Sequence, residues 1–205
     1  MIKLDAITDI RMGVTLRGRD ATRAVEAGSC RLVRISDISQ DGTWSNEVFA
    51  SIEPAERIRE EQFLKSGDVL FPNRGTRTTA IVYRLGEARA LAGAQFFVLR
   101  PDASKVLPEY LAWFLRTEQA ARHFEERRKG TYVQIIQRSD LAELAIPLPS
   151  LEKQRKIVEV AAWSVEERRL LGRLAALKVR LVNGELVGVA KDTDRHGQTR
   201  TDTDG

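Results

Sequence analysis

The alternation of apolar and polar residues divides the chain into two regions of different character. Up to about residue 149, short apolar runs are separated by turn residues, and one longer amphipathic run follows Pro108. Several short strands combined with one or two helices are typical of a mixed α+β domain. From residue 151 to about residue 182 the chain has no proline and repeats its large apolar residues at helical spacing. This second region predicts one long helix.

Within the first region, four apolar runs predict strands over residues 31–38, 68–72, 80–85 and 94–99. A short charged surface helix is expected over residues 55–63. A longer helix is expected from Pro108 to about residue 128, with the proline at its first position. Near the N-terminus, three apolar residues spaced by three predict a short amphipathic helix or turn: Leu4, Ile7 and Ile10.

The two regions are joined by the sequence I-P-L-P-S at residues 146–150. Each proline disfavours the helical conformation in the residue before it, so the joint is expected to be extended. Ser150 is then expected to cap the following helix through its side-chain oxygen. The last residues of the chain are polar and repetitive, which predicts disorder. The predicted organisation is a globular domain over residues 1–149, a dimerisation helix over 150–183 and a disordered tail over 184–205.

Seven positions of the expected long helix alternate in steps of three and four, which is the spacing of a coiled-coil seam. Glu167 occupies one of them, and the other six are large apolar residues: Val160, Trp163, Leu170, Leu174, Leu177 and Leu181. A seam of this kind packs against another helix. The alternative is that the helix folds back onto the first region of its own chain.

The charge of the chain is mildly positive, with 33 Lys+Arg against 29 Asp+Glu and a formal net charge of +4. This balance permits a polyanionic partner without requiring one. Arginine greatly outnumbers lysine, and its planar guanidinium group suits phosphates and guanine edges. A GC-rich source would raise the arginine content in the same way, so composition alone leaves both explanations open.

Two loops bring arginines together with small polar residues. The first carries Arg17 and Arg19 beside glycines, without the Lys-Ser/Thr pair of a nucleotide-binding loop. The second, N-R-G-T-R-T-T at residues 73–79, contains no acid and carries Arg74, Gly75, Arg77, Thr78 and Thr79. Backbone N–H groups, hydroxyls and guanidinium groups in such loops can contact DNA together. The alternative for both loops is a solvated turn.

Residues suited to catalysis or metal binding are sparse. The single cysteine, Cys30, lies in a strand-like run where a buried inert thiol is expected, and its isolation fits a reducing cytoplasm. His123 has no second histidine or cysteine nearby, so neither a metal site nor a catalytic triad is expected. A glycine-rich methyltransferase loop and the Glu-x-Lys of common Mg²⁺ nucleases are also missing. No apolar run is long enough to cross a membrane. The sequence therefore predicts a non-catalytic cytoplasmic protein.

Four segments occur in a recognisable order. They are R-I-S-D-I-S at residues 34–39, S-G-D-V-L-F at 66–71, L-P-E-Y-L-A-W-F-L at 107–115, and G-T-Y-V-Q-I-I-Q-R-S-D-L-A-E-L-A-I-P-L-P-S-L-E-K-Q-R-K-I at 130–157. In order and spacing they resemble the specificity subunits of Type I restriction-modification systems, and the resemblance covers about residues 1–182. That family usually carries two target-recognition domains and two such helices per chain, whereas this chain has one of each.

The resemblance implies a DNA-recognition subunit that directs an adenine-N6 DNA methyltransferase subunit, and a restriction subunit where one exists, to a bipartite site in double-stranded DNA. S-adenosylmethionine, ATP and Mg²⁺ would then be bound only by those partners. The resemblance also adds three candidate DNA-binding residues, Thr131, Tyr132 and Gln134.

For the helix, the resemblance implies pairing of two copies as a homodimer, with pairing to a different specificity subunit as the competing arrangement. Two other functions stay open. One is an assembly or regulatory interaction protein that keeps the fold without reading DNA. The other is a catalytic protein of an unfamiliar type.

Overall fold

The computed structural model describes residues 1–17, 23–39, 42–45, 48–75, 79–84, 86, 88–127 and 135–197, with side chains described as far as residue 187. The chain divides into two compact units, Met1–Val158 and Glu159–Gly205. The first unit contains every strand of the described residues, the helices α1 to α3 and the first two turns of α4 (Leu151–Gly197), and the remainder of α4 lies in the second. The predicted α+β class with one long helix is confirmed.

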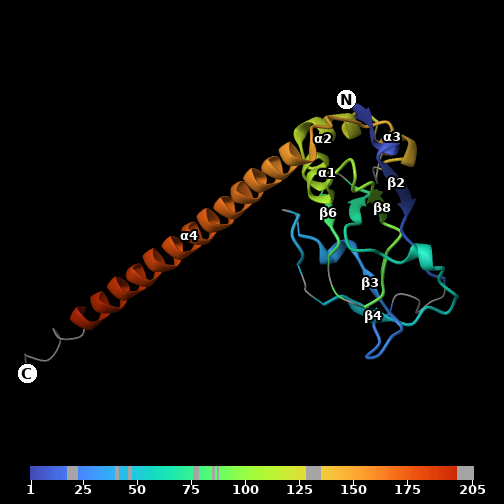
Figure 1. Ribbon diagram of the computed structural model, residues 1–205. Helices are drawn as coiled ribbons and strands as arrows, with labels where there is room; N and C mark the ends of the chain where they lie inside the picture. The colour runs from blue at the N-terminus through green and yellow to red at the C-terminus, as the bar shows by residue number, and fades with distance from the viewer. Residues whose placement is uncertain are drawn as a thin grey trace, which may run out of the picture. The chain divides into compact units, whose positions relative to one another are not determined.

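Three small sheets form the first unit. The main sheet is antiparallel with the strand order β2-β8-β5-β6, and its strands are Thr8–Met12, Phe96–Pro101, Val69–Pro72 and Ile81–Val82. The second sheet has the order β4-β3-β7, with β3 parallel to β7, and its strands are Ala50–Ile52, Cys30–Val33 and Ala90–Ala92. The third pairs β1 with β9, which are Ile2–Lys3 and Ala145–Ile146. Figure 1 shows β2, β8 and β6 between the short helices at one end of the unit and β3 and β4 at the other.

The short helices of the first unit are α1 (Pro108–Leu115), α2 (Glu118–Glu125) and α3 (Arg138–Ala142). Pro108 stands at the first position of α1 as expected, but the single helix predicted over residues 108–128 is wrong. Thr117 interrupts it, because its Oγ1 donates to the Phe114 carbonyl at 2.6 Å and accepts the Ala120 N–H at 3.4 Å. The threonine thereby closes one helix and caps the next.

The predicted burial at the N-terminus is confirmed, although the predicted helix is not. Leu4, Ile7 and Ile10 are all buried, but they lie on a 3-10 turn (Leu4–Ala6) and on β2. Pairing of β2 with β8 provides the backbone hydrogen bonds that a helix would otherwise make. The surface helix predicted over residues 55–63 is likewise reduced to a 3-10 turn, Glu60–Gln62.

The main core lies between the main sheet and the short helices, and its large buried side chains include Phe71, Phe97, Tyr110, Leu111 and Phe124. Cys30 is buried beside a smaller cluster under the second sheet, as predicted. Burial raises the pKa of its thiol, so the reactive thiolate is disfavoured.

The joint between β9 and α4 is not helical, which agrees with the prediction, and hydrogen bonds fix it to the unit. The Tyr110 hydroxyl donates to the Pro147 carbonyl at 2.8 Å, and the predicted cap is a long contact of 3.4 Å from the Lys153 N–H to the Ser150 Oγ. Gln154, which sequence reasoning missed, is fully buried. Its Nε2 donates to the carbonyls of Lys105 and Pro149, and its Oε1 accepts the Leu107 N–H, each at 2.9 Å.

The helix α4 is longer than predicted and continues through Gly184 to Gly197. The disordered tail predicted over residues 184–205 is therefore wrong for residues 184–197, and residues 198–205 lie outside the described part. A glycine inside a helix costs about 1 kcal/mol relative to alanine but keeps its backbone N–H, so it weakens a helix without ending it.

Candidate nucleic-acid interface

Three of the segments predicted to contact DNA converge at one end of the main sheet. The first begins after Met12 at the end of β2, and the second begins at Asn73 after β5. The third returns into the described chain at Ile135. These three points are far apart in sequence but are joined by contacts through Asn73.

Asn73 is buried, with 3% of its surface exposed, and bonds to three other segments. Its N–H donates to the Gln95 carbonyl at 2.9 Å, and its own carbonyl accepts the Ile136 N–H at 3.0 Å. Its Nδ2 donates to the Ala94 carbonyl at 2.9 Å and lies 3.7 Å from the Met12 Sδ. The residue therefore holds the starts of two predicted loops and the end of the third in a fixed relation.

Arg74 follows directly and forms an isolated antiparallel bridge with Ile135, while its side chain is exposed. Gly75 then turns the backbone with a φ of +82°, a conformation that residues with a Cβ rarely adopt. A Cβ built on Gly75 would meet nothing within 4 Å, so this glycine is required by backbone conformation rather than by space. The exposed Arg74 side chain therefore extends from backbone that is paired with the third segment.

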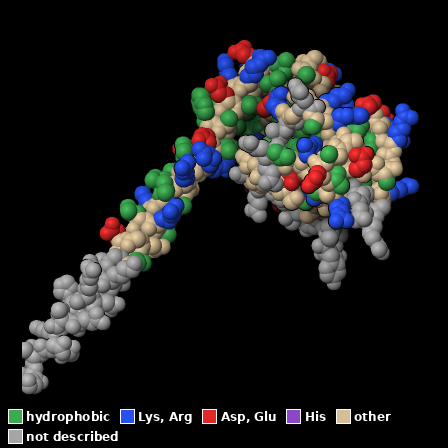
Figure 2. Space-filling model, turned by 90° about the horizontal axis from the view of Figure 1, so that it is seen from below, with side chains coloured by type: hydrophobic (Ala, Val, Ile, Leu, Met, Phe, Trp, Pro, Cys, Tyr) green, Lys and Arg blue, Asp and Glu red, His purple; other side chains and the backbone are tan. Residues whose placement is uncertain are grey.

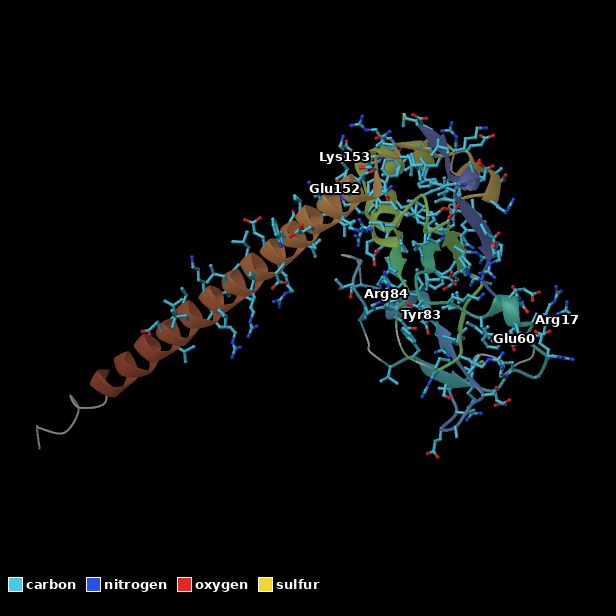
Figure 3. All side chains as sticks on the ribbon, viewed as in Figure 1. Arg17, Glu60, Tyr83, Arg84, Glu152 and Lys153 are labelled. Carbon is cyan, nitrogen blue, oxygen red and sulfur yellow. The ribbon has the colours of Figure 1, made fainter. Side chains whose placement is uncertain are left out.

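The first segment leaves the sheet through a close backbone approach. A Cβ at Gly13 would lie 2.1 Å from the Gly93 carbonyl oxygen, so only glycine fits there. Val14 then pairs with Gly93, and Leu16 packs against the small apolar cluster of the second sheet. The next residue, Arg17, has an exposed side chain, which Figure 3 shows extending from the surface of the unit.

The structure describes only part of the predicted DNA-binding set. Arg17 and Arg74 are exposed and Gly75 is half-buried. Thr79 is only 7% exposed and lies just before β6, so little of its side chain is at the surface. The remaining candidates lie outside the described residues: Arg19, Arg77, Thr78, Thr131, Tyr132 and Gln134. An asparagine directly after a strand-ending proline is the one sequence signal that points to Asn73.

Other arginines have structural roles. Asp68 is almost fully buried, and Arg100 donates from Nε and Nη2 to its two carboxylate oxygens at 2.7 and 2.6 Å. This hydrogen bonding raises the pKa of Arg100. The Lys65 N–H also donates to Asp68, at 2.8 Å. The carboxylate thus joins a turn to β8, which explains part of the arginine content without DNA.

Among the described residues, no group of three or more His, Cys, Asp or Glu side chains is arranged to hold a metal ion. The ring of His123 is used locally, because its Nε2 lies 2.8 Å from the Asp140 carbonyl oxygen. None of the described helices has the length and apolarity needed to cross a bilayer.

In the second unit, the predicted seam of α4 is made of exposed side chains. Its six apolar residues have between 49% and 66% of their surface exposed: Val160, Trp163, Leu170, Leu174, Leu177 and Leu181. Hydrophobic side chains along the described part of α4 are visible in Figure 2. Scattered exposed apolar residues are ordinary, but six on one heptad spacing mark a surface for another helix.

Comparison with known proteins identifies related sequences. A family model described as the Type I restriction modification DNA specificity domain matches residues 9–160. The type I restriction enzyme MjaX specificity subunit of Methanocaldococcus jannaschii is 29% identical over 119 residues, which are 51% of this chain and 27% of that protein. The HindI specificity subunit of Haemophilus influenzae is 29% identical over 110 residues, 47% of this chain and 22% of that protein. The matched part is about a quarter of the length of these relatives.

Solved structures share the fold. One, from work on complex assembly and conformational transition of the type I R-M system, has a TM-score of 0.59 at 23% identity and covers 90% of this chain and 41% of its own. The HsdS subunit from Thermoanaerobacter tengcongensis has a TM-score of 0.56 at 22% identity, covering 82% and 37%. This chain therefore spans less than half of either structure, and the likeness supports a common architecture.

Proposed function

We propose a function that proceeds from one premise: the chain belongs to the family of Type I restriction-modification DNA specificity domains. In this proposal the unit Met1–Val158 reads one part of a bipartite site in double-stranded DNA. An adenine-N6 methyltransferase subunit, and a restriction subunit where one exists, perform the chemistry with their own S-adenosylmethionine, Mg²⁺ and ATP. This chain is then a non-catalytic subunit acting in the cytoplasm, where those partners meet DNA.

The observation that carries the proposal is the convergence of three predicted segments at Asn73. An interface that reads bases must hold several side chains in one register along a groove, and loops that share a buried anchor meet this need. Arg74 is exposed at that place and can contact a phosphate or the edge of a guanine. The next candidates lie outside the described residues: Arg77, from the same loop in sequence, and Thr131, from the segment that precedes Ile135.

The test is the variant Arg74→Ala with Arg77→Ala, measured as DNA binding by the complex assembled with its methyltransferase. Loss of a bidentate guanine contact should cost about 1–3 kcal/mol on the cognate site and relax specificity at one base pair. Loss of phosphate contacts should instead weaken binding to all sequences and flatten the salt dependence. Arg122→Ala is the matched control, because that exposed arginine lies on α2 and pairs with Glu118.

Unchanged DNA binding by the double variant would overturn the assignment of Arg74 and Arg77 as DNA contacts. If the methyltransferase bound the same DNA site in the absence of this subunit, the competing function as an assembly protein that does not read DNA would be favoured. The two outcomes differ, because the first leaves DNA recognition in this chain and moves it to another surface.

We also propose that two copies of the chain pair through the seam of α4. Six half-exposed large apolar residues on one helix are stabilised when a second helix covers them. Light scattering at micromolar concentration should show a dimer, and Leu170→Glu with Leu174→Glu should convert it to a monomer. Val179→Glu is the matched control, because Val179 is 60% exposed but lies off the seam.

A monomer in the unmutated chain would overturn self-pairing and leave a different specificity subunit, or the chain's own first unit, as the cover for the seam. A dimer that persists in the variant with Leu170→Glu and Leu174→Glu would show that the copies pair through another surface.

A further inference from the structure

A fourth segment lies at the same end of the main sheet as the three predicted loops. It is the turn at residues 93–95, which joins β7 to β8. In the sheet, β8 lies between β2 and β5 and runs antiparallel to both, so the turn lies between the last residues of those two strands. The first two predicted loops begin there, at Met12 and Asn73. The turn is therefore placed in the middle of the candidate interface.

The backbone of this turn is held from both sides. Asn73 donates its N–H to the Gln95 carbonyl and its Nδ2 to the Ala94 carbonyl, each at 2.9 Å. On the other side, Val14 forms a bridge with Gly93. A side chain carried by the turn thus starts from a fixed point, which a residue that reads a base needs.

Gln95 is the residue of this turn whose side chain is exposed. Glycine, proline, asparagine, aspartate and serine favour turns for conformational reasons, and glutamine is not among them. The side-chain amide of Gln95 makes no hydrogen bond to another described residue. The part of the fold that is described does not use this amide, so it is available to another molecule.

Two exposed apolar side chains lie close to the turn. Met12 has 53% and Ile135 has 43% of its surface exposed, although large apolar residues of the first unit are mostly buried. The Met12 Sδ lies 3.7 Å from the Asn73 Nδ2, and Ile135 is bridged to Arg74. Apolar side chains gain nothing from phosphates, whereas the C5-methyl group of thymine is an apolar contact in the major groove. Their presence beside basic residues indicates contact with bases.

The described residues of the four segments also carry no carboxylate. They contain three arginines and neither Asp nor Glu: residues 12–17, 73–75, 93–96 and 135–138. DNA can therefore approach this end of the sheet without repulsion from an acidic side chain of these segments.

We infer that Gln95 reads an adenine in the major groove and that Met12 contacts the methyl group of a thymine there. The amide oxygen of glutamine accepts a hydrogen bond from adenine N6 while its NH2 group donates to N7, and no other base presents this combination in the major groove. Asn73 is bonded to the backbone of Gln95 and lies against Met12, so the two side chains come from adjoining points. The inference rests on the proposed function in DNA recognition and adds the base pair that is read.

The test selects duplexes with a randomised segment, using the complex assembled with its methyltransferase subunit. The unmutated complex should enrich an A·T pair at a position where Gln95→Ala loses that preference and binds the selected duplex on the order of tenfold more weakly. Replacing that adenine with 7-deazaadenine, which lacks the N7 acceptor, should weaken binding by the unmutated complex but not by Gln95→Ala. Replacing the thymine with deoxyuridine, which lacks the methyl group, should likewise have no effect on Met12→Ala.

Gln95→Glu separates base reading from a role in the fold. A carboxylate cannot donate to adenine N7 but accepts a hydrogen bond from cytosine N4, so the preference at that position should change from adenine to cytosine. A residue that only holds the turn could not exchange one base preference for another. Gln119→Ala is the matched control, because this exposed glutamine lies on α2, and it should leave the selected sequence unchanged.

The outcomes distinguish this inference from the proposed function. If the unmutated complex enriches no sequence, both are wrong. If Gln95→Ala and Gln95→Glu enrich the same sequence as the unmutated complex, Gln95 reads no base while the proposed function stands. Equal weakening on every duplex would also overturn base reading and make Gln95 a contact to the DNA backbone. Thermal unfolding of each variant is compared with that of the unmutated chain, and Gln95→Glu, which keeps the size of the side chain, decides if Gln95→Ala does not fold.

Discussion

The two units of the chain treat the same kind of residue in opposite ways. In the unit Met1–Val158, large apolar side chains such as Phe71 and Leu111 are completely buried. In the unit that begins at Glu159, Leu174 and Leu177 are about half exposed. The first unit thus buries these hydrophobic residues within one chain, whereas the second keeps them at its surface. Its helix should therefore be stabilised by association and be sensitive to protein concentration.

The comparison extends to the charges. Arg100 in the first unit is committed to a buried carboxylate of its own chain, while Arg173 in the second has no described ion-pair partner. Residues that build the fold are satisfied locally, and residues left unsatisfied mark surfaces for other molecules. This difference makes the following changes informative.

The largest expected effect comes from cutting the core of the first unit. Phe71→Ala removes a fully buried ring that packs at 5.1 Å from Phe124, and should cost about 3–5 kcal/mol of unfolding free energy. Urea titration followed by tryptophan fluorescence measures this, and the cost should not depend on protein concentration. Leu174→Ala is the counterpart on α4 and should instead lower the dimer affinity. A similar, concentration-independent cost for both variants would contradict the division into two kinds of region.

Gln154 is the next test, because it belongs to α4 but is buried within the first unit. Gln154→Ala removes three hydrogen bonds and leaves the Leu107 N–H without its acceptor, at a cost of about 1–3 kcal/mol. The neighbouring Arg155→Ala, at an exposed position, should change the unfolding free energy by less than about 0.5 kcal/mol. Equal effects of the two substitutions would show that the start of the helix does not depend on this anchor.

Part of the fold could be predicted from the sequence alone. Features that depend on neighbouring residues are predicted well: the strand ending at Pro72, the start of α1 at Pro108, and the non-helical joint before α4. The heptad seam is equally local and its residues are placed as expected on one helix. In each case the preference is set by backbone sterics or by periodicity within a few turns.

The remainder depends on contacts between distant parts of the chain. Whether Thr117 stays within a helix or caps a new one is decided by packing, since threonine is compatible with both. Asn73 is bonded to Ala94 and Ile136, and Gln154 to Lys105 and Leu107, all of them far away in the sequence. In the sequence, Asn73 and Gln154 are each only one polar residue among many. For the candidate interface, sequence indicated the basic loops, but only the fold shows that three segments share one anchor.

A smaller effect is expected at the joint, where it also depends on pH. Burial raises the pKa of Tyr110, so its contribution to stability is present below about pH 10, the ordinary tyrosine pKa, and is lost as the pH rises further. Tyr110→Phe removes the hydrogen bond to the Pro147 carbonyl and should cost about 1 kcal/mol at neutral pH. The variant should then lose less stability than the unmutated chain between pH 9 and about pH 11. Burial and Asp68 also raise the pKa of Tyr83, so part of the alkaline loss should remain.

The smallest change concerns the face of α4 away from the seam. Gly172 lies inside the helix with nothing within 4 Å of a built Cβ, so Gly172→Ala should stabilise the helix by up to about 1 kcal/mol. Thermal unfolding of the isolated protein, followed by circular dichroism, should show this gain with no change in the dimer affinity, because the residue is off the seam. Repeating the measurement with the methyltransferase subunit bound asks whether that face is also covered. A gain in thermal stability in the free protein that reverses in the complex would show that a partner backbone approaches Gly172 closely. A gain that persists in both would leave the seam as the surface of α4 that partners use.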